Sequence, residues 1–154
     1  MKIDEDEFKP LLELVGKITI YKNYHRQATV GVGRSVVFGK GRVRKKPGLV
    51  DFISNTRYPE IYKEILRLKQ IICNNEEYNV IVLNHNFECA KHTDKNKSDS
   101  IAIGFGNYEG GNLVINDVPN NIKYNSVKFD GNQSPHYVSP ITFGNRYSLI
   151  FTNH

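Results

Sequence analysis

From residue 78 to the C-terminus the chain is a succession of short β-rich segments, and this pattern constrains the fold more than any other feature. The segments cover residues 78–83, 87–91, 100–105, 113–115, 126–129, 136–138 and 146–151. Turn-forming groups rich in Asn, Asp, Gly and Pro separate them, at residues 84–86, 94–96, 110–111, 118–121, 130–131 and 143–145. Short strands at such spacing are typical of a β-sandwich or barrel, and no strand–helix–strand alternation is present to build a parallel sheet.

The first half of the chain adds helices. Apolar residues at helical spacing predict a short helix over residues 8–15 and a longer one over residues 59–73. Residues 18–21 and 28–38 are predicted to be extended, the second with a bend at its glycines, and residues 39–48 form a basic, glycine-rich loop. The predicted fold class is mainly β with flanking helices (α+β), with a jelly-roll, or double-stranded β-helix, core.

The length of 154 residues fits one domain, with residues 1–75 as a helical and basic region and residues 76–154 as the core. No apolar run approaches the ~20 residues of a membrane span, and the acidic N-terminus has no signal-peptide pattern. Only two cysteines are present, Cys73 and Cys89. We therefore expect a monomer without membrane contact, in the cytoplasm or nucleus, where thiols stay reduced.

The positive charge of the chain is concentrated in one stretch. The net charge is +5, but residues 17–50 hold nine Lys and Arg and no Asp or Glu. Arg34, Arg42 and Arg44 alternate there with apolar residues, as on one face of a β-ribbon. Such a surface suits a nucleic-acid backbone if it borders a site, although a solvated basic loop has the same composition.

The residues that carry chemistry lie in the second half. On a strand, His92 and Asp94 would project from the same face, which supplies two of the three ligands of a 2-His-1-carboxylate metal site. A further histidine, His136, follows 44 residues later. Arg146 and Ser148 come after it at strand spacing, and together they can hold a carboxylate. By itself the His92–Asp94 pair is a weak signal, because this combination is common by chance and favours two exposed polar residues at a strand end.

Taken together, these residues resemble the Fe(II)/2-oxoglutarate-dependent dioxygenase superfamily. The matching parts are His92-x-Asp94, the distal His136, the Arg146-x-Ser148 pair and the Gly-x-Tyr-x-Gly-Gly-x-Leu stretch over residues 106–113. Within the superfamily the pattern loosely resembles the TET/JBP-like branch and its small viral and algal relatives, which act on nucleic-acid bases. AlkB-like members instead have a tyrosine where this chain has Asn86.

The resemblance implies an enzyme that uses O2, with Fe(II) bound by His92, Asp94 and His136. The cosubstrate 2-oxoglutarate would be held by Arg146 and Ser148, and it would leave as succinate and CO2. Asn84 is either a cosubstrate contact or a polar strand-end cap, and Asn96 either steadies the turn after Asp94 or touches substrate.

Three functions fit this sequence. The first is hydroxylation of a nucleic-acid base or its methyl group, with Arg34, Arg42, Arg44 and Asn96 as substrate contacts. The second is the same chemistry on a protein side chain or a small molecule. The third is a nucleic-acid-binding module without activity, and the intact set of ligands argues against it.

Overall fold

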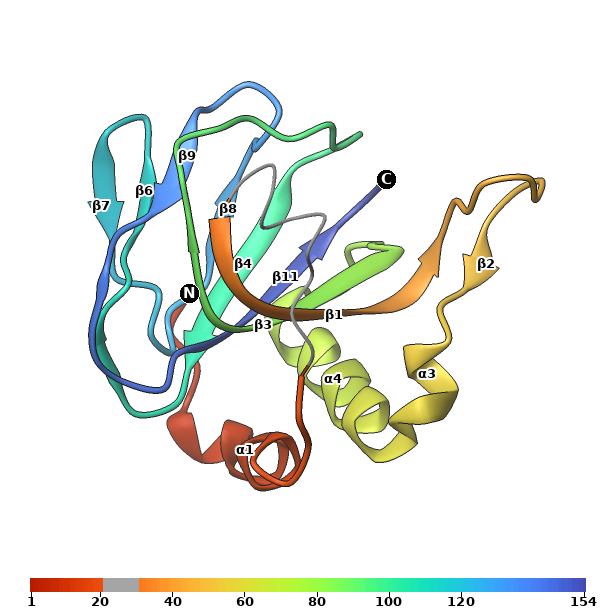
Figure 1. Ribbon diagram of the computed structural model, residues 1–154, viewed down its shortest axis with the longest axis horizontal. Helices are drawn as coiled ribbons and strands as arrows, with labels where there is room; N and C mark the ends of the chain where they lie inside the picture. The colour runs from red at the N-terminus through yellow and green to blue at the C-terminus, as the bar shows by residue number, and fades with distance from the viewer. Residues whose placement is uncertain (21–30) are drawn as a thin grey trace.

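The computed structural model describes residues 1–20 and 31–154, and it arranges them in layers (Figure 1). A six-stranded sheet in the order β2-β1-β3-β11-β4-β8 lies at the centre, and its described pairings are all antiparallel. Its strands are β1 (Gly31–Gly41), β2 (Val50–Asp51), β3 (Val80–Cys89), β4 (Ser100–Phe105), β8 (Val127–Phe129) and β11 (Tyr147–Thr152).

Two smaller sheets accompany the central one. The three-stranded sheet has the order β7-β6-β9, and β5 pairs with β10 in a two-stranded ribbon. These strands are β5 (Tyr108–Gly110), β6 (Leu113–Ile115), β7 (Val118–Asn120), β9 (His136–Val138) and β10 (Ile141–Gly144). Fold class is therefore as predicted: mainly β, with few helices.

The helices cover the face of the central sheet that is turned away from the three-stranded sheet. They are a 3₁₀ turn (Glu5–Phe8), α1 (Lys9–Val15), α3 (Ser54–Arg57) and α4 (Pro59–Ile72). Every third or fourth residue of α4 is buried, from Ile61 to Ile72, because this spacing gathers them on one side of the helix. They pack with α1 against strand residues such as Phe38 and Leu149, which are fully buried. None of the described helices has the length and hydropathy needed to cross a membrane.

The inner face of the central sheet carries two cross-strand rows that matter for the site. Strand alternation sends every second side chain inward, so directly paired residues form a row across β1, β3, β11 and β4. One row is polar or small: Ser35, Asn84, Ser148 and Gly104. The next row, two residues along each strand, is apolar: Val37, Val82, Ile150 and Ala102. Together the rows provide a polar floor beside an apolar one.

Several predicted boundaries are confirmed and others are wrong. The predicted strands at 100–105, 113–115 and 136–138 match β4, β6 and β9, and the two predicted helices match α1 and α4 within two residues. Residues 18–20 are not in a strand, whereas residue 21 and residues 28–30 lie outside the described residues.

The predicted turns at residues 84–86, 118–121 and 143–145 are the main errors. β3 runs without interruption through 84–86, because β1 and β11 pair with it on both sides there. The left-handed backbone of Asn86, with φ of 49°, is the only trace of a turn in those three residues. The other two groups contribute to β7 and β10. Likewise, the predicted basic loop starts later, because β1 continues to Gly41.

A candidate metal and cosubstrate site

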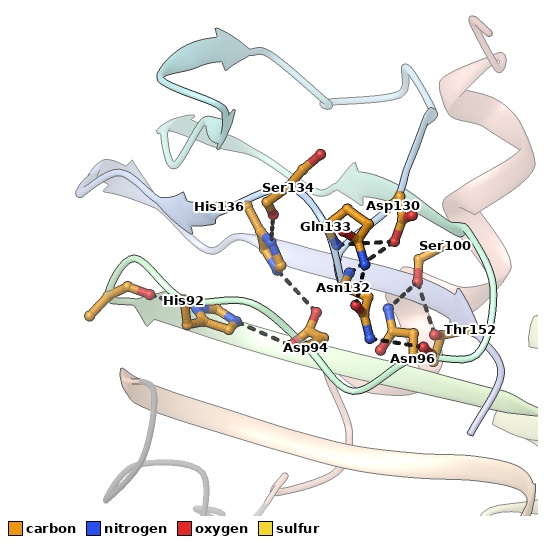
Figure 2. Close-up of polar contacts among 11 residues, drawn as sticks. His92, Asp94, Asn96, Ser100, Asp130, Asn132, Gln133, Ser134, His136 and Thr152 are labelled. Atoms are coloured by element: carbon orange, nitrogen blue, oxygen red, sulfur yellow. Dashed lines mark hydrogen bonds and ion pairs between the residues drawn. The ribbon is translucent and has the colours of Figure 1, made fainter.

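The structure brings the three predicted metal ligands together (Figure 2). The Asp94 carboxylate lies between two imidazoles, with Oδ1 3.3 Å from His92 Nε2 and Oδ2 3.0 Å from His136 Nε2. The potential ligand atoms of all three residues lie within 4.8 Å of one another. Each Nδ1 contacts a backbone carbonyl, at 2.6 Å from Ala90 O for His92 and 2.8 Å from Ser134 O for His136. A histidine that donates from Nδ1 leaves Nε2 free to bind a metal.

Backbone pairing, and not a shared strand, holds these ligands in place. Residues 90–99 are outside the strands, so the expectation that His92 and Asp94 project from one strand face is wrong. Instead His92 and His136 exchange two backbone hydrogen bonds of 3.0 and 2.9 Å, and the Asp94 N–H donates to Gly131 O at 2.8 Å. The start of β9 and the segment before it therefore align the loop that carries the first two ligands.

The donor atoms of the cluster suit a divalent cation once His92 has lost its proton. A hydrogen bond to Asp94, followed in size by one to Cys89, raises the pKa of His92 from 6.5 to about 10. Burial opposes ionisation of Asp94, but the hydrogen bonds from His136 and His92 outweigh it and lower the pKa of its carboxyl. Two imidazoles and one carboxylate on one side, with the remaining positions open, form the donor set of non-haem Fe(II) sites.

Metal affinity is expected to rise with pH because His92 must lose a proton to bind. Between its ordinary pKa of 6.5 and the raised value of about 10, the metal-free site holds this proton. The apparent association constant for Mn(II) should then increase about tenfold per pH unit between about pH 7 and pH 8.5. Calorimetry in buffers of different ionisation enthalpy should count close to one proton released per metal. Binding that neither releases a proton nor varies with pH would contradict this linkage.

Gly131 has no side chain, and this leaves room for the neighbouring metal ligands. A Cβ at this position would lie 2.9 Å from Asp94 Oδ2, 3.1 Å from Asn96 Nδ2 and 3.2 Å from His136 Cε1. The backbone there is not left-handed, so alanine is conformationally allowed and its only cost is this contact. Gly131→Ala is expected to weaken Mn(II) binding roughly tenfold or more, as loss of a ligand-orienting contact does.

Gly16→Ala, the same change at the end of α1, serves as the control for Gly131→Ala. Calorimetric titration with Mn(II) measures both variants. Equal affinities would show that the site tolerates the added methyl group.

A chamber beside the ligand cluster contains the predicted cosubstrate residues. Arg146, Ser148 and Asn84 are at most 3% exposed, and all three line this chamber together with the metal ligands. Arg146 Nε donates to Gly111 O at 2.9 Å, and Asn84 Nδ2 donates to Ser148 Oγ at 3.3 Å. The rest of the lining is largely apolar: Phe87, Ala102, Leu113, Ile122, Phe129, Val138 and Ile150.

Arg146 is a buried cation with no ion pair to any carboxylate among the described residues. Burial lowers the pKa of its guanidinium, since a charge is costly in an apolar surrounding. The carboxylate of a dicarboxylic acid would supply the missing partner, and guanidinium binds carboxylate in a bidentate manner. The residues therefore fit 2-oxoglutarate as well as a metal.

Tyr108 is a site residue that the sequence analysis missed. It is 2% exposed, its ring lies 5.8 Å from the Arg146 guanidinium, and its hydroxyl has no hydrogen-bond partner among the described residues. The hydroxyl lies over Gly104, next to Ser148 in the polar row. Burial raises the pKa of Tyr108, so it stays a neutral donor at pH 7. Its place in the Gly-x-Tyr-x-Gly-Gly stretch was a usable signal.

The remaining predicted residues lie at different distances from the site. Asn96 is buried and donates to Ser100 Oγ at 2.9 Å, which favours the turn-steadying interpretation. Arg42 lines a groove that also contacts Asp94, whereas Arg44 is exposed in the loop between β1 and β2. Arg34 is not brought to the site, because its Nη1 donates to Ile20 O at 2.9 Å, away from the inner face.

Comparison with known proteins identifies the fold. No protein-family model and no curated protein sequence matches the chain. NgTET1 in complex with 5mC DNA aligns with 97% of this chain and 67% of its own, at a TM-score of 0.63 and 16% identity. A 2OG-Fe(II) oxygenase family oxidoreductase from Burkholderia pseudomallei aligns with 97% of this chain and 79% of its own, at a TM-score of 0.58 and 16% identity.

A third solved structure has the same fold. A prolyl-4-hydroxylase from Pseudomonas putida aligns with 99% of this chain and 89% of its own, at a TM-score of 0.50 and 15% identity. The fold is thus that of the 2OG-Fe(II) oxygenases, with their jelly-roll core, as the sequence motifs predict. The His92, Asp94 and His136 cluster lies within that fold, beside the chamber that contains Arg146.

Proposed function

We propose that the protein is an Fe(II)- and 2-oxoglutarate-dependent dioxygenase. The observation that carries this proposal is that one chamber is lined by both a three-ligand cluster and a buried arginine that has no ion pair among the described residues. A metal-binding protein has no need of the arginine, and a carboxylate-binding protein has no need of the ligands. Fe(II) and 2-oxoglutarate together satisfy both.

The residues in and around the chamber would divide the work between them. His92, Asp94 and His136 would hold the metal from one side and leave the other positions free. Arg146 would bind the far carboxylate of 2-oxoglutarate, with hydrogen bonds from Ser148 and Tyr108. The apolar wall around Leu113, Ile122 and Phe129 would exclude water. When bound, iron supplies the oxygen chemistry that couples decarboxylation of 2-oxoglutarate to succinate and CO2 with hydroxylation of a substrate C–H bond.

For the substrate we propose a nucleic-acid base or its methyl group. The concentration of positive charge in residues 17–50 supports this, and Arg42 from that stretch lies in a groove next to Asp94. NgTET1, which has the same fold, was crystallised with 5mC DNA. The alternative substrate is a protein side chain or a small molecule. The prolyl-4-hydroxylase, which has the same fold, supports this alternative.

The direct test is anaerobic titration with Fe(II) and 2-oxoglutarate, followed by a substrate screen in air. We expect one metal and one cosubstrate to bind per chain, and succinate to form. Oligonucleotides and peptides are then screened by mass spectrometry for an added oxygen atom. Failure to bind 2-oxoglutarate in the presence of metal would refute the enzymatic proposal, and oxidation of peptides alone would refute the nucleic-acid substrate.

A further inference from the structure

A groove of about 420 Å³ lies next to the cosubstrate chamber, on the inner face of the central sheet. Its floor is the apolar row: Val37, Val82 and Ile150 are directly paired across three strands and all line it. Ile150 and Asp94 line both the groove and the chamber. The groove therefore adjoins the chamber at Ile150 and borders the metal cluster at Asp94.

An aromatic ring forms one wall of this groove. Phe52 follows β2, is half-buried, and belongs to neither of the hydrophobic clusters that form the core. Its backbone N–H donates to Gly39 O at 3.0 Å. A Cβ on Gly41 would lie only 2.2 Å from Phe52 Cζ, so the absence of a side chain there is what allows the ring to lie across β1. Phe52 thus presents an aromatic surface that the core does not use.

Two exposed cations line this groove, beside the Asp94 carboxylate. Arg42, from the β1–β2 hairpin, and Lys95, next to the metal ligand Asp94, both line the groove and are exposed. Neither forms an ion pair with a described residue, unlike Lys91 and Lys128, which do. The hairpin projects at the right of Figure 1 and carries further positive charge in Arg44, Lys45 and Lys46. An apolar floor, an aromatic wall and two exposed cations complement a base joined to phosphates.

We propose that this groove is the substrate-recognition site and that it takes an unpaired nucleotide of a single strand, with the base against Phe52 and flanking phosphates on Arg42 and Lys95. This inference rests on the proposed nucleic-acid substrate and adds where and by which residues it is recognised. A duplex keeps its bases stacked inside, so only an unpaired or flipped base can reach the ring. Aromatic stacking together with a cationic path is the general mode of single-strand binding.

A charge-matched pair of variants tests the phosphate contacts. Arg42→Ala with Lys95→Ala removes two charges from the groove, and Arg57→Ala with Lys63→Ala removes two exposed charges from α3 and α4. Binding of a fluorescent single-stranded oligonucleotide is measured by anisotropy at several salt concentrations, with Mn(II) and 2-oxoglutarate present. The groove variant should flatten the log–log salt slope by about 1.4, since each single-strand phosphate contact contributes about 0.7. The control should keep the wild-type slope.

A second variant tests the stacking without changing charge. Phe52→Leu keeps an apolar side chain over Gly41 but removes the ring. An oligonucleotide with 2-aminopurine as the target base should lose fluorescence on binding to the wild type, and this quenching should be absent in Phe52→Leu. Affinity should fall roughly fivefold or more, as expected for loss of one base–aromatic stack.

The outcomes separate this inference from the proposed function, because Mn(II) and 2-oxoglutarate binding are measured in parallel and depend on other residues. A groove variant that binds the oligonucleotide like its control, or unchanged quenching in Phe52→Leu, overturns the inference and leaves the enzyme assignment intact. A wild type that binds no single strand also overturns it. The inference is also overturned if a Glu/Tyr-rich peptide binds in the groove and the oligonucleotide does not.

Discussion

Replacing Asp94 with alanine is expected to abolish succinate formation and to weaken Mn(II) binding by at least about 100-fold. Loss of an outer-shell partner costs 10- to 100-fold in metal affinity, and Asp94 is a direct donor between two imidazoles. The substitution also removes the main cause of the raised pKa of His92. The His92 titration, followed by NMR, should therefore move from about 10 back toward 6.5.

Asp99→Ala is the matched control for Asp94→Ala, because Asp99 is an exposed carboxylate in the same connection between β3 and β4. It should bind Mn(II) and form succinate like the wild type. If Asp94→Ala retained wild-type metal affinity, Asp94 would not be a metal ligand. Its ion pair with His92 would then serve to stabilise the fold.

Replacing Arg146 with alanine is expected to raise the dissociation constant for 2-oxoglutarate by roughly 100-fold or more, since breaking one side of a buried charge pair costs several kcal/mol. The mechanism predicts a thermal signature as well. A ligand at 100 times its dissociation constant stabilises a protein by about 2.7 kcal/mol. The wild type should therefore melt several degrees higher with 2-oxoglutarate and Mn(II), and Arg146→Ala should lose the part due to 2-oxoglutarate.

Arg146→Lys separates charge from geometry. Lysine keeps the positive charge but cannot offer the planar fork of a guanidinium or the Nε–H bond to Gly111 O. The affinity of Arg146→Lys for 2-oxoglutarate is expected to lie between those of the wild type and Arg146→Ala. Mn(II) affinity measured in the absence of 2-oxoglutarate should be unchanged in both variants, and if it fell with the same factor, the substitution would have damaged the chamber as a whole.

The site could be predicted because its chemistry depends on residue type and order. His92, Asp94, His136 and Arg146 match a known motif when they are taken together, and the structure places them around one chamber. Their local geometry could not be predicted in the same way. Asp94 is positioned by Gly131, which is 37 residues away, and such a contact leaves no periodic signal in the sequence.

The basic stretch shows a second limit of the sequence pattern. Alternation suggested one charged face, but the even-numbered residues of β1, such as Phe38, point toward the helices. Arg34 is also even-numbered and is directed away from the inner face. The pairing of β1 with β3 shifts its register between Val32 and Arg34. Arg42 reaches the groove only because β1 ends at Gly41, so that alternation no longer applies. The residue at which β1 ends depends on its pairing partners, and its partner β2 is only two residues long. The alternation within β1 does not reveal this.

The backbone pairing of His92 with His136 has a consequence for chain topology. These two residues are 44 positions apart, and β4 to β8 lie between them. A metal ion shared by both would close that stretch into a ring, as a disulfide does, and in the chain-entropy model a ring of this size is worth on the order of 4 kcal/mol. Metal supply would then govern how long the folded chain survives proteolysis, in addition to whether it turns over substrate.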